Sequence, residues 1–147
     1  IFLGETINTP SMLANEDYLV ALKWAKSVGG LKGLIARAEA NAKVVWDFCA
    51  KNPWLKNLAA TPEIASTTSV CVKFDDPRIK DGEAFAKAVA KRIEKAGAGF
   101  DLGAYRDAPA GLRIWCGSTV ETADVQALMP WIDWAFHAEI AALSQAA

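Results

Sequence analysis

The sequence is poor in the residues that most often hold metals or act as nucleophiles. Its 147 residues include one histidine, His137, and three cysteines, Cys49, Cys71 and Cys116, with no C-x-x-C pair. Zinc takes its ligands mainly from cysteine and histidine, so this supply predicts no metal site. A serine-histidine-aspartate triad would need His137, which falls in a helical pattern and is expected at the surface or the core edge. The widely spaced cysteines are predicted to be buried free thiols of a reducing compartment.

A strong charge of one sign and a long apolar run are also missing. Lysine and arginine number 16 against 17 acidic residues, a net charge of -1, which predicts no general attraction to nucleic acid or to a membrane. No apolar run has transmembrane length. Gly29-Gly30 lacks the preceding strand of a glycine-rich phosphate loop. The start, residues 1–5, has neither methionine nor the basic region of a signal peptide, so we expect a piece of a longer protein.

What is present favours one domain, or one domain with a piece of another. Hydrophobic residues make up 52% of the chain, and six tryptophans suffice for a real core. Trp24, Trp46, Trp115, Trp131 and Trp134 are predicted to lie in that core. Polar residues follow one side of the second helical stretch and are predicted to be solvated, namely Lys32, Arg37, Asn41, Lys43 and Asp47.

Apolar spacing predicts an α+β fold, with helices covering a small, largely antiparallel sheet. Strands are expected over residues 69–74 and 112–116, where apolar and polar residues alternate, and weaker strands over 55–60 and 99–104. Pro130 predicts a kink or a restart in the last helix. The predicted helices cover residues 13–28, ended by Gly29-Gly30, 31–49, ended by Asn52-Pro53, 85–96, closed by Gly97, and 125–143.

Two arginines flank a turn from Pro109 to Gly111 and give the chain its clearest functional signal. Because side chains alternate along a strand, Leu112 and Ile114 can face a core while Arg113 faces a cleft or solvent. The guanidinium is a planar fork that fits a carboxylate or a phosphate. A surface salt bridge is the plain alternative, and Arg106 across the turn favours an anion site instead. No general base or activated nucleophile accompanies the two arginines.

Two stretches resemble a known family, the phosphoserine aminotransferases, at the C-terminal domain. The resemblance runs in order along nearly the whole chain, and the two motifs are specific in combination. They are Ile7-Asn8-Thr9-Pro10-Ser11-Met12, followed by a helix ending at Gly29-Gly30 and a long helix, and Tyr105-Arg106 through Gly111-Leu112-Arg113.

The resemblance implies a cytoplasmic homodimer of the fold type I pyridoxal-phosphate enzymes. Such an enzyme moves an amino group from L-glutamate to 3-phosphohydroxypyruvate, giving O-phospho-L-serine and 2-oxoglutarate in serine biosynthesis. By resemblance, Arg113 binds the substrate α-carboxylate and Arg106 binds the substrate phosphate. Asn8 and Thr9 would reach the phosphate of the pyridoxal phosphate held by the partner subunit. Tyr105 stands where many members of the family have histidine.

The resemblance also divides the chain. Residues 1–30 would be the tail of an upstream cofactor-binding domain with its linking helix, and residues 31–147 the C-terminal aminotransferase domain. The Schiff-base lysine of the family lies upstream, so no catalytic residue is expected here. The fragment alone is expected to be inactive and not to bind the cofactor.

Two alternatives stay open on the sequence alone. A related enzyme, an alanine-glyoxylate type aminotransferase or a cysteine desulfurase, would keep an arginine matching Arg113 but need no phosphate-binding Arg106. A free-standing α+β binding or regulatory module would use the anion-binding residues without catalysis.

Overall fold

The fold was established from a computed structural model, which describes residues 4–103, 105 and 108–145. The chain divides into two compact units, Ile1–Ala36 and Arg37–Ala147. The boundary between them falls inside helix α2 (Gly30–Lys51). No helix in the described ranges is long and apolar enough to cross a membrane.

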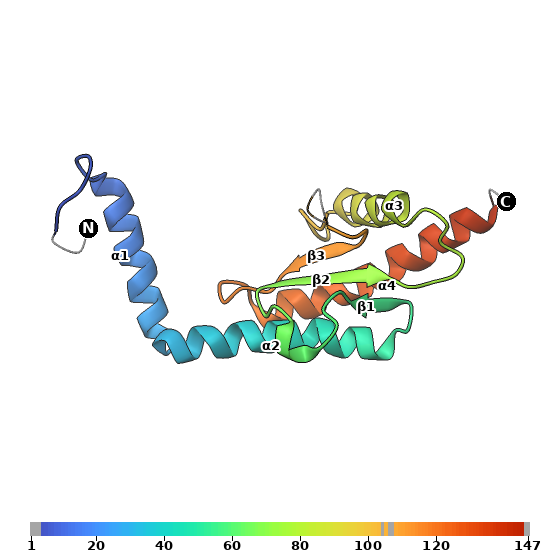
Figure 1. Ribbon diagram of the computed structural model, residues 1–147, viewed down its shortest axis with the longest axis horizontal. Coiled ribbons are helices and arrows are strands. Elements are labelled where there is room, and N and C mark those ends of the chain that lie inside the picture. The colour runs from blue at the N-terminus through green and yellow to red at the C-terminus, as the bar shows by residue number, and fades with distance from the viewer. Residues whose placement is uncertain (1–3, 104, 106–107, 146–147) are drawn as a thin grey trace. The chain divides into compact units, whose positions relative to one another are not determined.

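The first unit is built on helix α1 (Met12–Ser27), coloured blue in Figure 1. Ser11 precedes it, and its hydroxyl accepts a hydrogen bond from the Ala14 backbone N–H at 3.4 Å, which satisfies one of the free donors of the first turn. Gly29 has a φ of 101°, which glycine adopts without strain, so the helix ends where the sequence predicted. None of the residues of α1 is buried, and Trp24 is 37% exposed, so its predicted place in a core is wrong.

The second unit contains a three-stranded antiparallel sheet in the order β1 (Leu55–Asn57), β2 (Ser69–Phe74) and β3 (Leu112–Trp115). The strand register places Val70 opposite Ile114 and Val72 opposite Leu112. Helices α3 (Gly82–Lys95) and α4 (Thr122–Gln145) complete the unit together with α2, and a short 3-10 helix, η1 (Pro62–Ile64), lies between β1 and β2. The predicted α+β architecture with a small antiparallel sheet is confirmed (Figure 1).

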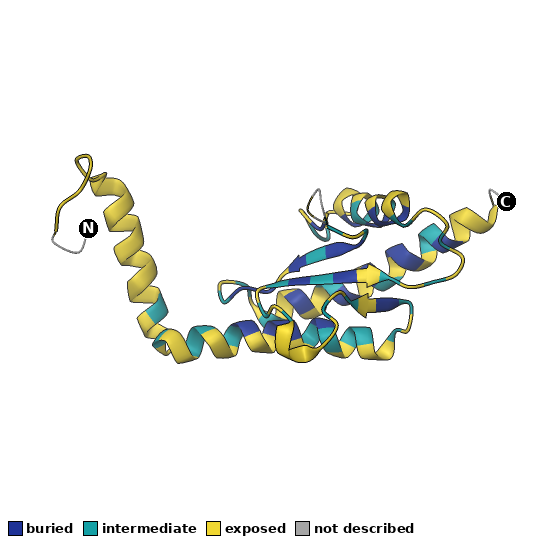
Figure 2. Cartoon of the chain, viewed as in Figure 1, coloured by how far each residue is buried: buried dark blue, intermediate teal, exposed yellow. Residues whose placement is uncertain are grey.

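One face of the sheet and three helices enclose a single apolar core. Val70, Val72, Leu112 and Ile114 are buried on the same face of the sheet. The buried cluster joins them to Val45 of α2, Val89 of α3 and Ile132 of α4, among others, and the dark blue segments of Figure 2 mark these stretches. By alternation the opposite face of the sheet carries Cys71, Lys73, Arg113 and Trp115. Arg113 and Lys73 therefore lie on the face of the sheet opposite the apolar core.

The tryptophans are less buried than predicted. Trp115 is 54% exposed because it alternates with the buried residues of β3, and Trp131 and Trp134 are 41% and 44% exposed because on α4 the core takes Ile132, Ala135 and Phe136 instead. Trp46 is half-buried against the core. The aromatic centre is formed by Trp54, whose ring stacks on that of Phe136 with 3.8 Å between centroids. The three cysteines are free as predicted, but only Cys116 is buried, whereas Cys49 and Cys71 are half-buried.

Two expectations about elements need correction. Helix α4 does not restart at Pro130 but continues through it, because buried residues before it (Val125, Met129) and after it (Ile132, Phe136) are held in the same core. The missing proline N–H removes a single helical hydrogen bond, which that packing outweighs. The predicted strand over residues 99–104 is reduced to one bridge, Gly103 to Leu112.

Candidate anion-binding site

Strand β3 fixes the position of Arg113. Leu112 and Ile114 on either side of it are 1% and 2% exposed and lie in the core, so the arginine side chain leaves the sheet on the opposite face, as predicted. The Arg113 backbone N–H donates to the Leu102 carbonyl at 2.9 Å. The residue just before β3 is Gly111, and a Cβ there would lie 2.0 Å from the Val72 carbonyl oxygen, too close for any other residue. These backbone contacts fix Arg113 where residues 102 and 103 meet β3.

The guanidinium of Arg113 has two partners in the described part of the chain. Its Nη2 donates to a carboxylate oxygen of Asp101 at 2.6 Å, and its Nη1 donates to the Tyr105 hydroxyl at 3.4 Å. The guanidinium carbon also lies 4.6 Å from the centroid of the Tyr105 ring, a cation-π contact. Burial lowers the pKa of Arg113, but Asp101 and Tyr105 more than offset this, and the net pKa is raised. The side chain is therefore a fixed cation.

The fork of Arg113 is not filled. Its side chain is only 16% exposed, and its Nε is buried without a hydrogen-bond partner among the residues that the structure describes. A buried donor of this kind is uncommon in folded proteins and points to a ligand or to another part of the protein that completes it. The guanidinium of Arg113 accordingly has hydrogen-bonding capacity that the described residues leave unused.

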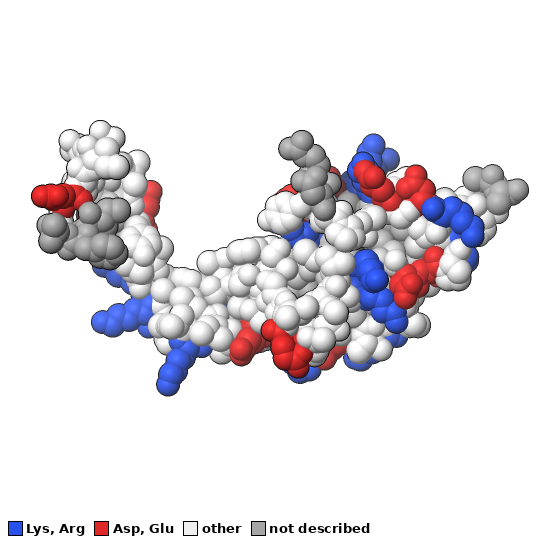
Figure 3. Space-filling view, in the orientation of Figure 1, with Lys and Arg blue, Asp and Glu red and all other residues white. Residues whose placement is uncertain are grey.

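A cavity of about 600 Å³ is lined on one side by α3 and on the other by residues that precede β3. Asp101 and Tyr105, the two partners of Arg113, are among its lining residues, as are Lys87 and Lys91 of α3, whereas Arg113 itself does not line it. Figure 3 shows basic and acidic side chains next to one another around α3 and α4. The surroundings are mixed in charge, so local donors such as Arg113 decide anion binding here rather than a broad basic field.

The structure does not place the other predicted site residues relative to Arg113. Arg106 lies outside the described residues. Asn8 and Thr9 are exposed in the polar segment before α1, and neither side chain has a hydrogen-bond partner in the described ranges. They belong to the first unit and Arg113 to the second, and the two units are not placed relative to one another. His137 lies on α4, 3.5 Å from Asp133 and exposed, as predicted.

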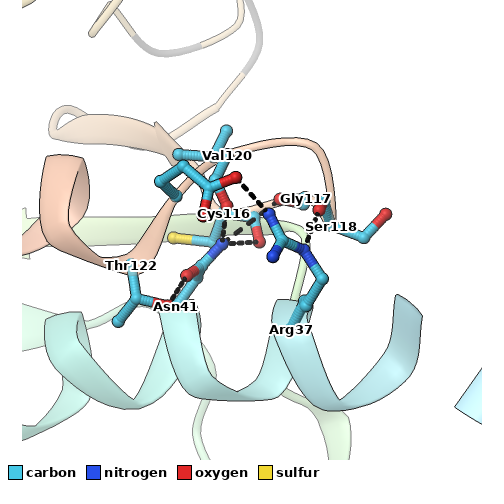
Figure 4. Close-up of polar contacts among 8 residues, drawn as sticks. Arg37, Asn41, Cys116, Gly117, Ser118, Val120 and Thr122 are labelled. Carbon is cyan, nitrogen blue, oxygen red and sulfur yellow. Dashed lines mark hydrogen bonds and ion pairs between the residues drawn. The ribbon is translucent and has the colours of Figure 1, made fainter. Parts of the chain in front are cut away.

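Sequence reasoning missed a buried polar network on α2, drawn in Figure 4. Asn41, predicted to be solvated, is 0% exposed. Its amide donates to the carbonyls of Cys116 and Gly117 at 3.3 Å and of Val120 at 2.9 Å, and its oxygen accepts from the Thr122 hydroxyl at 2.6 Å. Of these three carbonyls only that of Gly117 also accepts a backbone N–H, from Val120 at 3.0 Å, so the side-chain donor matters most for Cys116 and Val120. The prediction failed because Asn41 lies three residues after Ala38 and four before Val45, on the buried side of α2.

Arg37 acts on the same loop, one turn earlier on α2. Its Nε donates to the Ser118 carbonyl at 2.7 Å, and its Nη2 contacts a carboxylate oxygen of Glu121 at 2.6 Å (Figure 4). This residue too was predicted to be solvated, and it is partly buried instead. Together the two side chains fasten the end of β3, which carries Arg113, to α2 and to the start of α4.

Comparison with known proteins finds relatives that match nearly the whole chain. Over 139 residues, 93% of the chain, it is 55% identical to phosphoserine aminotransferase of Methanosarcina barkeri. The chain is homologous to a C-terminal part of phosphoserine aminotransferases. The enzyme of Methanosarcina mazei is 54% identical over 136 residues, 92% of the chain. The chain spans about a third of the length of these relatives, 36% and 35%. No family model matches the chain.

Solved phosphoserine aminotransferases share the fold. The structure from Bacillus circulans subsp. alkalophilus superposes with a TM-score of 0.76 at 20% identity, covering 90% of this chain and 34% of that one. A second, pyridoxal-phosphate-bound structure from Trichomonas vaginalis gives a TM-score of 0.72 at 25% identity, covering 87% and 34% of the two chains. The predicted likeness to the small domain of this aminotransferase fold is confirmed.

Proposed function

We propose that the chain is the C-terminal part of a pyridoxal-phosphate-dependent phosphoserine aminotransferase. The complete enzyme converts 3-phosphohydroxypyruvate and L-glutamate to O-phospho-L-serine and 2-oxoglutarate in serine biosynthesis. The observation that carries the proposal is the 55% identity to the Methanosarcina barkeri enzyme over 93% of the chain. The pyridoxal-phosphate-bound relative from Trichomonas vaginalis supports the cofactor.

In this proposal Arg113 binds the α-carboxylate of the substrates. The physical support is a fixed guanidinium, 16% exposed, whose partners Asp101 and Tyr105 line a cavity and whose Nε is unused in the described part of the chain. A carboxylate can accept two parallel hydrogen bonds from such a fork, which fixes the orientation of the substrate as well as its affinity. Arg106 is proposed to bind the substrate phosphate, on family resemblance alone.

The cofactor, when bound, supplies the electron sink for carbanion formation at the substrate α-carbon. Asn8 and Thr9 fit its phosphate chemically, because an amide N–H and a hydroxyl are donors and both side chains are exposed with no internal partner in the described ranges. We propose that they hold the phosphate of the cofactor bound by the other subunit of a homodimer. Residues 1–30 are then the tail of the cofactor-binding domain with its linking helix, and residues 31–147 the C-terminal domain.

The work of this part of the chain is binding and orientation. Arg113 would hold the substrate so that its α-carbon stands at the cofactor, which lowers the entropic part of the barrier. The lysine that carries the cofactor in this family matches no lysine here, so we propose that the 147 residues alone are inactive.

The test is an assay of the protein encoded by the complete reading frame. With L-glutamate as donor, we expect turnover of 3-phosphohydroxypyruvate far above that of glyoxylate or pyruvate. A preference for glyoxylate would contradict the proposal and favour an alanine-glyoxylate type aminotransferase. A reading frame that encodes no cofactor-binding part, and a product without transaminase activity, would favour a non-catalytic module.

A further inference from the structure

Arg113 already contacts a carboxylate that belongs to its own chain. The Asp101 oxygen lies 2.6 Å from Nη2, at a position that a carboxylate ligand of this arginine would also seek. The two partners differ sharply in burial, since the side chain of Arg113 is 16% exposed and that of Asp101 is 84% exposed. The pair therefore joins a fixed, largely enclosed cation to a solvent-exposed carboxylate.

The backbone conformation of Asp101 and its neighbours positions this carboxylate beside Arg113. The φ of Asp101, 53°, lies in the left-handed region, the sole such value for a non-glycine residue in the described ranges. Aspartate and asparagine tolerate this conformation better than other side chains do. The next two residues are held to β3, because the Leu102 carbonyl accepts from Arg113 N–H and Gly103 bridges to Leu112. The carboxylate is thus aimed at the guanidinium by the same backbone bonds that define the edge of the sheet.

We infer that Asp101 competes, from within the chain, for the anion site of Arg113. A carboxylate ligand displaces Asp101 from the guanidinium when it binds. The identity of that ligand rests on the proposed function, whereas the competition rests on the geometry of the pair. Losing an exposed ion-pair contact costs Asp101 little, because water replaces the arginine. Arg113 cannot be left without an anion as cheaply, because it is largely enclosed. The exchange therefore moves Asp101 outward and leaves the guanidinium in place.

Tyr105 has a separate part in this exchange. Its ring lies against the guanidinium at 4.6 Å and carries no charge that a ligand would have to displace. It keeps the plane of the fork fixed while one carboxylate replaces another. A specific consequence follows: removing the charge of Asp101 should tighten the binding of carboxylates, whereas a merely structural role of Asp101 would make any substitution weaken it.

The experiment measures the affinity of the complete, cofactor-loaded protein for glutarate, a dicarboxylate with no amino or keto group, by isothermal titration calorimetry. Asp101→Asn keeps the shape and the backbone preference and removes the charge, and we expect glutarate to bind about twofold to fivefold more tightly, the range of a single exposed ion pair. Asp47→Asn is the matched control, because it removes the same charge from an exposed pair with Lys43 on α2. That control should leave glutarate affinity unchanged.

Weaker or unaltered glutarate binding by Asp101→Asn overturns the inference, and so does equal tightening by the control. Asp101→Gly gives a second reading should Asp101→Asn fold poorly, because glycine accepts the positive φ and also lacks the carboxylate, and it too must tighten binding. Arg113→Gln separates this inference from the proposed function. If Arg113→Gln leaves glutarate affinity intact, the carboxylate site itself is misplaced; if it weakens binding while the Asp101 variants do not tighten it, the site stands and the competition fails.

Discussion

Two polar side chains, one on β3 and one on α2 beside the end of that strand, differ in burial and in how many of their hydrogen bonds are satisfied. Asn41 is fully buried, and every polar atom of its amide is used inside the chain, by three loop carbonyls and the Thr122 hydroxyl. Arg113 is partly exposed, its main partner is an aspartate that stands in water, and its Nε is idle in the described part of the chain. The first arrangement is complete without a ligand and the second is not.

This difference separates scaffold from site. A buried network in which each group is satisfied rigidifies the structure and has nothing left to offer a ligand. A cation whose donors are only partly used retains binding capacity. The two are also coupled, because Asn41 and Arg37 hold the loop in which β3 ends and so keep Arg113 where it is. Changes at Asn41 should therefore act on stability, and changes at Arg113 on binding.

The largest effect is expected at Asn41. Asn41→Leu has a similar volume but removes the side-chain donor of the Cys116 and Val120 carbonyls, while the Gly117 carbonyl keeps the Val120 N–H, and it should lower the free energy of unfolding by about 3 kcal/mol. Chemical denaturation measures the loss, and hydrogen exchange over residues 116–121 should rise locally. Lys43→Ala on the same helix removes an exposed pair with Asp47 and should cost no more than about 0.5 kcal/mol. Equal losses for the two variants would mean that the network is not the scaffold.

Arg113 should show the opposite profile. In the complete enzyme, Arg113→Gln should slow both half-reactions by on the order of 30-fold or more, because both amino acids lose the same carboxylate contact. Its denaturation midpoint should stay close to that of the parent, since Asp101 is exposed and is left in water. Stopped-flow measurement of each half-reaction tests the first expectation. A large loss of stability with intact half-reactions would make Arg113 a scaffold residue.

The sequence predicted the helices and strands, and which strand residues face the core, better than it predicted the side-chain contacts. Alternation around Arg113 placed that residue opposite Leu112 and Ile114, because a strand's period of two is a local property. Asn41 was misplaced because residue type alone assigns asparagine to water, whereas loop carbonyls far along the chain require it inside. Asp101 could not have been singled out at all, since its pairing with Arg113 depends on the path of residues 99–103, where a predicted strand became a single bridge.

An effect mainly on one of the two half-reactions is expected at Arg106, which lies outside the described residues and whose role rests on resemblance. If Arg106 binds the substrate phosphate, Arg106→Ala should slow the half-reaction with phosphoserine much more than the one with glutamate, whose distal group is a smaller carboxylate. Arg106→Lys should recover more activity than Arg113→Lys, because a phosphate accepts a point charge while a carboxylate clamp depends on the planar fork. Equal slowing of the two half-reactions by Arg106→Ala would remove the phosphate role.

The smallest effect tests a third arginine, whose fork is already filled. Arg78 donates from Nε and Nη2 to the two carboxylate oxygens of Asp76 at 2.8 and 2.7 Å, within one turn. This bidentate contact lowers the pKa of Asp76 to about 2. A carboxyl group with a lower pKa in the folded state stabilises it above the ordinary aspartate pKa, and that contribution fades as the pH falls toward 2. The denaturation midpoint of the parent should therefore exceed that of Asp76→Asn slightly at pH 7, and the gap should close as the pH falls from about 5 toward 2. A gap that stays constant across this range would show that the variant disturbs the turn itself, and that a filled arginine fork is not the reason for the difference.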